Sequence, residues 1–419
     1  MRGAATSRDA RLMLSGIALD AFGTGLTVPF LVVYLHDVRA LPLETIGIIV
    51  AVPALIALVL LGPIGMLIDR LGPRRVQMGA LAGAAAGVFL LSSAESVFDA
   101  VVARILTGIG VAAFWPANQA LVASIVSSER RQRYFGVQFA CVNAGIGIGG
   151  IIGALFVDTA RPGTFVAIYR ADAATFLLAL AILAVPLRHL GGPPARSRTI
   201  VPDDVGSYAD VLRDRVFRRY LVVSFVAAFV GYGQIEGGWT AYANAVARVS
   251  SRTLGIAFAV NTAIIVLLQL VVLRLIDGRR RTRLLMIHAT VWGASWAVLG
   301  LAGQTPASPL ADVLMVVAFG LFGVGETLLS PTAPAIVNDV APERLRGRYN
   351  ATAAVAFQGA AISGPVVAGI LLGRNLGDAF IAMLIAGCAV LGVAALRLER
   401  VLPSRANGVH DTTAAANTR

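Results

Sequence analysis

The amino-acid sequence predicts an all-α membrane protein in which twelve transmembrane helices form two six-helix bundles. Three observations carry this prediction. The apolar residues come in long blocks, the arginines alternate between the two sides of those blocks, and parts of the first half of the chain recur in the second.

The apolar blocks define the spans. Of the 419 residues, 57% are hydrophobic and 14% are charged, whereas a soluble domain carries about 25% charged residues. Blocks of roughly 20 apolar residues match the ~30 Å hydrocarbon core of a bilayer, and their continuous apolarity favours helices over barrel strands. We expect spans at residues 12–35, 45–68, 76–93, 98–124, 135–157, 165–187, 217–243, 254–276, 284–303, 310–338, 349–373 and 377–397.

The arginines orient these spans. All 35 basic residues are arginines, and with a cytoplasmic N-terminus 28 of them fall in cytoplasmic segments and six on the opposite side. This asymmetry follows the positive-inside rule. We therefore expect a multi-pass protein of the plasma (inner) membrane with both termini in the cytoplasm. The net charge of +12 lies in these loops, which predicts contact with anionic lipid rather than with nucleic acid.

A long charged stretch near the middle divides the chain. We expect an N-terminal six-helix half at 1–190, a cytoplasmic linker at 191–216, a C-terminal six-helix half at 217–400 and a disordered cytoplasmic tail at 401–419. Residues 208–219 are predicted to form a short amphipathic helix on the membrane surface.

Small residues recur between the two halves at nearly constant offsets of 208 or 215 residues. The matched pairs are Gly23 with Gly231, Gly25 with Gly233, Gly108 with Gly323, Gly110 with Gly325, Pro116 with Pro331 and Gly149 with Gly364. Several matches at a fixed offset predict a duplicated bundle, as in transporters built from parallel repeats.

The loop between spans two and three resembles the first signature of the major facilitator superfamily. The matching residues are Gly65, Asp69, Arg70, Gly72, Arg74 and Arg75, with Pro73 where a basic residue is usual. The resemblance implies a gate, and we expect Asp69 to pair with Arg346 or Arg348 in one access state only. The alternative is that these charges only fix the topology.

Spans four and five carry two further resemblances. In span four, Arg104, Gly108 and Gly110 resemble a signature associated with proton-coupled members of that superfamily. Span five resembles the antiporter motif of drug–proton exporters, although its usual Gly-Pro pair is Gly149-Gly150 and its final Gly is Ala154. The matching glycines are Gly136, Gly145, Gly149, Gly150 and Gly153. We expect the last four to let spans five and eight pack closely and slide.

Four ionisable residues inside predicted spans are candidates for a role in transport, namely Asp20, Arg104, Glu236 and Glu326. A charge at membrane depth is unfavourable unless it faces water, finds a partner or, for a carboxylate, takes up a proton. We expect all four to serve proton coupling, with Arg104 acting on Asp20; the other role open to Glu236 and Glu326 is binding of a cationic substrate. The alternatives are a capping or cavity-lining role for Asp20, a structural bond from Arg104 to backbone, and an interfacial position for Glu236.

Polar and aromatic residues in the spans are candidates for the wall of a central cavity, where cations and aromatic compounds can stack. The substrate-binding candidates are Asn118, Gln138, Tyr232, Gln234, Trp239, Asn261 and Gln358. The alternative for such residues is hydrogen bonding between helices.

The motifs that are missing narrow the function. The sequence has no G-x-x-x-x-G-K-[ST] loop, no cluster of metal ligands and no nucleophile elbow, so we expect no ATP use, no metal, no cofactor and no enzyme activity. We expect a monomer that exports small apolar or cationic compounds by alternating access, in multidrug efflux driven by protons. The alternatives are a proton-linked importer of a sugar or organic acid, and a receptor that keeps the fold without transport.

Overall fold

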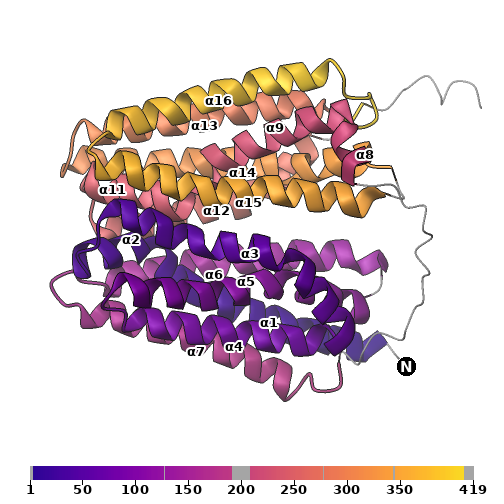
Figure 1. Cartoon of the computed structure of the whole chain (residues 1–419), viewed down its shortest axis with the longest axis horizontal. Helices are drawn as coiled ribbons and strands as arrows, with labels where there is room; N and C mark the ends of the chain where they lie inside the picture. Colours follow the sequence, from indigo (N-terminus) through magenta and orange to yellow (C-terminus); the bar gives the residue numbers. More distant parts are fainter. Residues whose placement is uncertain (1–2, 127, 191–207, 277, 343–344, 410–419) are drawn as a thin grey trace, which may run out of the picture.

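The computed structural model describes residues 3–126, 128–190, 208–276, 278–342 and 345–409. All regular elements in these ranges are helical, and twelve segments are long and apolar enough to cross a membrane. The predicted fold class and the predicted number of spans are therefore confirmed. Figure 1 shows the N-terminal half stacked beside the C-terminal half, with the long helices of both running in nearly the same direction.

The first span of each half is interrupted. Span one consists of α1 (Gly3–Thr27), η1 (Val28–Phe30), α2 (Leu31–Val33) and η2 (Tyr34–Val38), and span seven consists of α9 (Arg215–Val230), α10 (Tyr232–Gln234), η3 (Ile235–Trp239) and α11 (Thr240–Ala245). The short 3-10 segment η1 and the π-turns η2 and η3 break the regular backbone ladder, a feature tolerated at membrane depth where the helix lines a cavity.

The remaining spans are single helices. In the N-terminal half they are α3 (Leu43–Leu71), α4 (Pro73–Ser92), α5 (Val97–Ile125), α6 (Ser128–Phe156) and α7 (Gly163–Ala184). In the C-terminal half they are α12 (Ser251–Ile276), α13 (Arg281–Gly303), α14 (Pro309–Val340), α15 (Arg346–Gly373) and α16 (Gly377–Glu399).

Local chemistry sets two of the boundaries. Gly72 ends α3 with a φ of 84°, which glycine adopts without strain, and Pro73 begins α4 at the helix position that tolerates a missing N–H. The loop signature usually has a basic residue at this position. Here Pro73 takes its place and starts α4.

The prediction of a single surface helix over 208–219 is wrong about its length. Residues 191–207 of the predicted linker lie outside the described residues, and α8 covers only Tyr208–Arg213. The helix breaks at Asp214, because this side chain accepts hydrogen bonds from the backbone N–H groups of Val216 and Phe217 at 2.8 and 3.2 Å and so starts α9.

The tail is ordered over part of its length, contrary to the expected disorder of 401–419. Asn407 accepts hydrogen bonds from the backbone N–H and the hydroxyl of Thr282, at 3.0 and 3.1 Å, and thereby caps the start of α13. The rest of the predicted tail, 410–419, lies outside the described residues.

The contacts of the matched glycines repeat between the halves. Three sites where a Cβ would crowd a neighbour in the first half have equivalents in the second. Gly25 packs on α6 at Gly149 as Gly233 packs on α15 at Gly364, Gly108 packs on Pro53 as Gly323 packs on Asn261, and Gly110 packs on Ala84 as Gly325 packs on Trp292. Pro53 and Ala84 are themselves 208 residues from Asn261 and Trp292. The duplication inferred from sequence is therefore visible in three dimensions.

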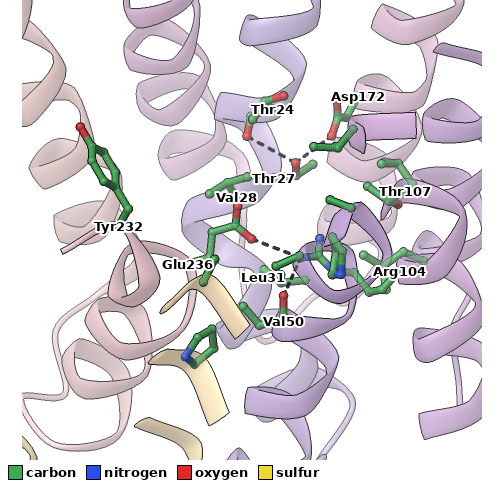
Figure 2. A pocket seen from close by; sticks show the side chains of 18 of the residues that line it. Thr24, Thr27, Val28, Leu31, Val50, Arg104, Thr107, Asp172, Tyr232 and Glu236 are labelled. Atoms are coloured by element: carbon green, nitrogen blue, oxygen red, sulfur yellow. Dashed lines mark hydrogen bonds and ion pairs between the residues drawn. The ribbon is translucent and has the colours of Figure 1, made fainter. Parts of the chain in front are cut away.

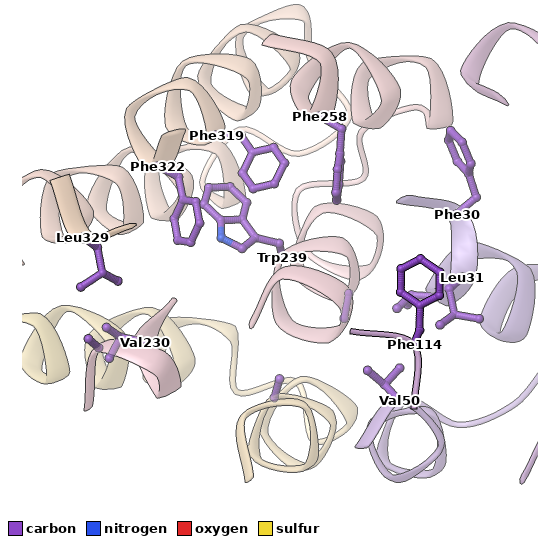
Figure 3. Packing of buried hydrophobic residues seen from close by; sticks show 14 of the residues in the cluster. Phe30, Leu31, Val50, Phe114, Val230, Trp239, Phe258, Phe319, Phe322 and Leu329 are labelled. Atoms are coloured by element: carbon purple, nitrogen blue, oxygen red, sulfur yellow. The ribbon is translucent and has the colours of Figure 1, made fainter. Parts of the chain in front are cut away.

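Aromatic rings fill the interior of the C-terminal half (Figure 3). The ring of Trp239 lies 4.7 Å from those of Trp296 and Phe319, and the rings of Trp292 and Phe322 stack at 4.4 Å. All five side chains are buried. Because this core packs around Trp239 of η3, it gives Glu236, which lies in the same segment, a rigid support.

The halves meet toward the end of the bundle that lies away from the chain termini (Figure 1). There Gly47 of α3 packs on the backbone of α15 at Pro365 and Gly369, Asn244 donates a hydrogen bond to Asp37 at 3.0 Å, and Glu44 lies 3.6 Å from Arg374. Nearer the termini, Gly62 and Gly65 of α3 and Gly136 of α6 have open space where a Cβ would stand. The close contacts described between α3 and α15 therefore lie toward the end away from the termini.

Candidate substrate cavity and its ion pair

A cavity of about 360 Å³ lies between the halves. Its wall comes from spans one, two, three, four and six of the N-terminal half and from spans seven and eleven of the C-terminal half. Most of the wall is apolar or aromatic, including Phe176, Tyr232 and Phe357. The charged groups in the wall are Arg104, Asp172 and Glu236. A concave, mostly apolar site with a few converging polar groups is typical of small-molecule binding.

An ion pair crosses the cavity from one half to the other (Figure 2). Nη2 of Arg104 on α5 lies 3.2 Å from Oε2 of Glu236 on η3. The Arg104 side chain is 11% exposed, whereas that of Glu236 is 44% exposed. Arg104 is thus held in the wall, and Glu236 is the member of the pair that a molecule in the cavity can reach.

Backbone groups of α3 hold Arg104 in place. Its Nε donates to the carbonyl of Ile49 and its Nη2 to that of Val50, each at 3.4 Å. The Ile49 carbonyl would normally accept from the residue four positions on, but that residue is Pro53, which has no N–H. The proline therefore leaves a carbonyl free for Arg104. Among the described contacts the carboxylate that Arg104 meets is Glu236 and not the predicted Asp20.

The structure adds one residue that the sequence analysis missed, Asp172 on α7. It is 2% exposed, lines the cavity and accepts a hydrogen bond from the Thr27 hydroxyl at 2.8 Å. An exposed arginine, Arg170, lies two residues earlier on the same helix. Residues two apart on a helix point about 200° from each other, so an exposed Arg170 is compatible with a buried Asp172. Helical periodicity was the signal that could have found it.

The other predicted ionisable residues lie behind the wall. Asp20 is close enough to Asp172 for the two charges to interact, and its Oδ1 has no hydrogen-bond partner. Glu326 lies within reach of the Tyr232 hydroxyl and the Asn261 amide. Neither Asp20 nor Glu326 is among the residues that line the cavity.

The predicted substrate-binding residues divide in the same way. Tyr232 and Gln358 line the cavity, and Gln358 donates a hydrogen bond across the halves to the Ala54 carbonyl at 3.3 Å. The others are placed between helices. Trp239 belongs to the aromatic core, Gln234 bonds to the Phe229 carbonyl, Asn118 bonds to Gln138, and Asn261 bonds to the Phe319 carbonyl.

The predicted gate is described only in part. The side chains of Asp69 and Arg346 lie outside the described residues, so their pairing stays a prediction. Arg74 donates to the carbonyls of Leu183 and Ala184 at the C-terminal end of α7, at 2.8 and 3.0 Å. The guanidinium of Arg348 lies over the Tyr208 ring of α8, 5.7 Å from its centroid. Gly72 ends α3, Gly65 has open space beside it, and Arg70 and Arg75 are exposed.

The predicted contact of the antiporter glycines is wrong for three of them. A Cβ on Gly145, Gly149 or Gly153 would meet α1 and η1 at residues 18–30, so these glycines seat span five on span one and not on span eight. Gly150, on the neighbouring face, approaches Gly255 of α12. Three glycines spaced four apart form one stripe of a helix, and that stripe faces the interior of the same half.

The fold and the cavity define a multi-pass membrane transporter. The family model of the Major Facilitator Superfamily matches residues 13–304 and 238–417. The chain is 25% identical over 360 residues to a tetracycline resistance protein, class G, of Vibrio anguillarum, covering 84% of this chain and 86% of the relative. It is 23% identical to a Na⁺, Li⁺, K⁺/H⁺ antiporter of Planococcus maritimus, covering 78% and 81%.

A solved structure has the same architecture. The D-xylose-proton symporter superposes with a TM-score of 0.74 at 16% identity, covering 95% of this chain and 98% of that one. The chain belongs to the major facilitator superfamily, as the signatures in its loops and spans implied.

Proposed function

We propose that this protein is a proton-driven exporter of small apolar or cationic compounds, located in the cytoplasmic membrane with both termini in the cytoplasm. One observation carries the proposal. The cavity is walled mainly by apolar and aromatic side chains and contains a half-exposed carboxylate, Glu236, whose partner Arg104 belongs to the opposite half. Such a wall suits a hydrophobic cation, because the rings can stack on it and the carboxylate can neutralise it.

The geometry suggests how binding acts on the halves. With the predicted topology the cavity opens to the cytoplasm. A cationic substrate that binds Glu236 replaces Arg104 and removes a bond between the halves, so it alters the balance between access states through a differential contact. The halves then rock, the substrate leaves on the opposite side, and protons that rebind there reset the carrier. The membrane potential supplies ~2.3 kcal/mol per charge per 100 mV.

Relatives support this direction of transport. Tetracycline resistance proteins and a cation–proton antiporter are among the proteins with similar sequences. The antiporter motif of span five, with Gly149 at its centre, agrees with that assignment.

The test is transport in inverted membrane vesicles from an overexpressing strain. We expect an imposed inside-acid gradient to drive accumulation of ethidium, a planar aromatic cation, and an uncoupler to abolish it. Glu236→Gln should abolish accumulation. The matched control is Glu399→Gln, which removes a glutamate paired with Arg280 at 2.8 Å outside the cavity and should leave accumulation intact.

Two results would contradict export. Accumulation of a sugar or organic acid in right-side-out vesicles under an outside-acid gradient, with no ethidium transport in the inverted ones, would establish the importer. Absence of any gradient-driven flux, together with an unchanged drug-resistance profile of the overexpressing strain, would favour a receptor.

A further inference from the structure

Unpartnered polar atoms converge in and directly behind the cavity wall of the N-terminal half. Oδ2 of Asp172 accepts from Thr27, but its Oδ1 is buried without a hydrogen-bond partner, as is Oδ1 of Asp20 on α1. The hydroxyl of Tyr169, one turn before Asp172, is also buried without a partner and lies near enough to interact with Asp172. Buried polar atoms are rarely left unsatisfied, so the cluster indicates a ligand or an exchangeable proton.

No basic side chain described here neutralises the two carboxylates. Arg104 is paired with Glu236. Helix α4, which packs on α7, has arginines only at positions 74 and 75. Arg74 is bonded to the carbonyls of Leu183 and Ala184. By the helical rise, these carbonyls lie ~16 Å along α7 from Asp172. Helix α6, which packs on α1, has charged residues only at positions 129–133. The part of α6 that contacts α1 at Ala18–Phe22 is Gly145, far from those charges. Asp20 lies one helical turn before Gly23, and a Cβ on Gly23 would overlap Oδ1 of Asp172, so the two carboxylates are neighbours across the contact between α1 and α7. Neighbouring carboxylates without a described counter-charge favour uptake of a cation, of which the smallest is a proton.

The packing favours the smallest cation. A Cβ on Gly23 would overlap both Oδ1 of Asp172 and the Thr175 hydroxyl, so Oδ1 lies directly against the backbone of α1. A metal ion needs several oxygen ligands around it, and this contact leaves no room for that shell on the Gly23 side. A proton needs only the space of a hydrogen bond.

We infer that Asp20 and Asp172 form a proton-binding pair in which one of the two carboxyl groups holds a proton, which is reached from the cavity through Asp172 and is separate from the Arg104–Glu236 ion pair. With one proton the pair carries a single negative charge. Loss of that proton to the cavity leaves two negative charges side by side, which repel each other and strain the contact between α1 and α7. The pair thus links proton occupancy to the seating of span one; its role in transport rests on the proposed proton-driven export.

The experiment is an infrared titration of the purified full-length protein in detergent, which reads the C=O stretching band of protonated carboxyl groups and needs no substrate. We expect the wild type to show the band at neutral pH and to lose it on alkaline titration. Asp172→Asn should remove part of the intensity and shift the midpoint of the remaining Asp20 band, because its like-charged neighbour is gone. Asp20→Asn should act reciprocally.

The controls separate this inference from the proposed function. Glu399→Gln, which removes a carboxylate outside the cavity, should leave the titration of the pair unchanged. An identical titration in wild type and Asp172→Asn would overturn the pair, and where that variant does not fold, Asp20→Asn carries the same test. A wild-type midpoint that shifts when sodium chloride replaces choline chloride, and does not shift in Asp172→Asn, would assign the site to an alkali ion instead. Ethidium efflux can be absent while the titration behaves as expected, and the titration can fail while ethidium efflux is present, so the two hypotheses are tested separately.

Discussion

Arg104 and Glu236 join the two halves of the bundle through a 3.2 Å ion pair inside the cavity. The arginine comes from α5 of the N-terminal half and the glutamate from η3 of the C-terminal half. A bond in this position can exist only while the two helices are close, so it reports on the access state and contributes to its stability.

The ion pair should be visible as a coupling free energy. In a double-mutant cycle of Arg104→Gln and Glu236→Gln, we expect the two losses in thermal stability to be non-additive by about 1 kcal/mol, a modest value because Glu236 is 44% exposed. Differential scanning fluorimetry of the purified variants measures it. The Arg280–Glu399 pair, which lies within one half, is the control, and additive losses at Arg104 and Glu236 would show that the pair does not hold the halves.

The glycines of span five should differ sharply in their tolerance of alanine. A Cβ on Gly149 would overlap the Phe22 carbonyl of α1, whereas one on Gly136 meets open space. We expect Gly149→Ala to destabilise the protein by about 1–3 kcal/mol through overpacking. Gly136→Ala should be neutral or stabilise by about 0.5–1 kcal/mol, because alanine is the better helix former. Equal thermal stability of the two variants would contradict the packing of span five on span one.

The seam at the end away from the termini should control which face is open. A Cβ on Gly369 would stand 2.6 Å from the Leu43 carbonyl and 3.1 Å from Cα of Gly47, so Gly369→Ala pushes α15 away from α3. We expect this variant to raise labelling of a Gln358→Cys cavity reporter from that face several-fold, measured with a membrane-impermeant maleimide after Cys141 and Cys388 have been replaced by alanine.

A neighbouring glycine supplies the control for the seam. A Cβ on Gly373 meets first the flexible Cγ of Glu44, at 2.7 Å, and that side chain can move aside. Gly373→Ala should therefore leave the labelling as in the reporter protein. If Gly369→Ala behaves in the same way, the seam is not the barrier on that face.

The ordered part of the tail should add stability to the C-terminal half. Asn407→Ala removes both hydrogen bonds to Thr282 at the start of α13, and we expect a loss of about 1 kcal/mol, the usual contribution of a helix cap. Ser404→Ala, in the same segment and exposed, should cost less than half of that. Similar thermal unfolding of the two variants would show that the cap contributes nothing.

The fold was predictable because the bilayer imposes it. Span number and span type follow from block length and apolarity, and the repeat follows from small residues such as Gly108 and Gly323, where helices must approach closely. The site was less predictable. The carboxylate that Arg104 meets depends on the rotation of η3 relative to α5, which no residue spacing encodes, and Trp239 looked like a cavity residue because burial in lipid and burial in protein select the same side chains.

The ion pair breaks the symmetry of the duplicated scaffold. At the offsets that relate the halves, Glu236 corresponds to Val28 and Arg104 to Phe319, so each half contributes one charge that its counterpart lacks. Two copies of either half alone, even if they assembled, would present only like charges at this place. The two ancestral repeats have therefore ceased to be interchangeable, and the bond between them belongs to the divergence that followed the duplication.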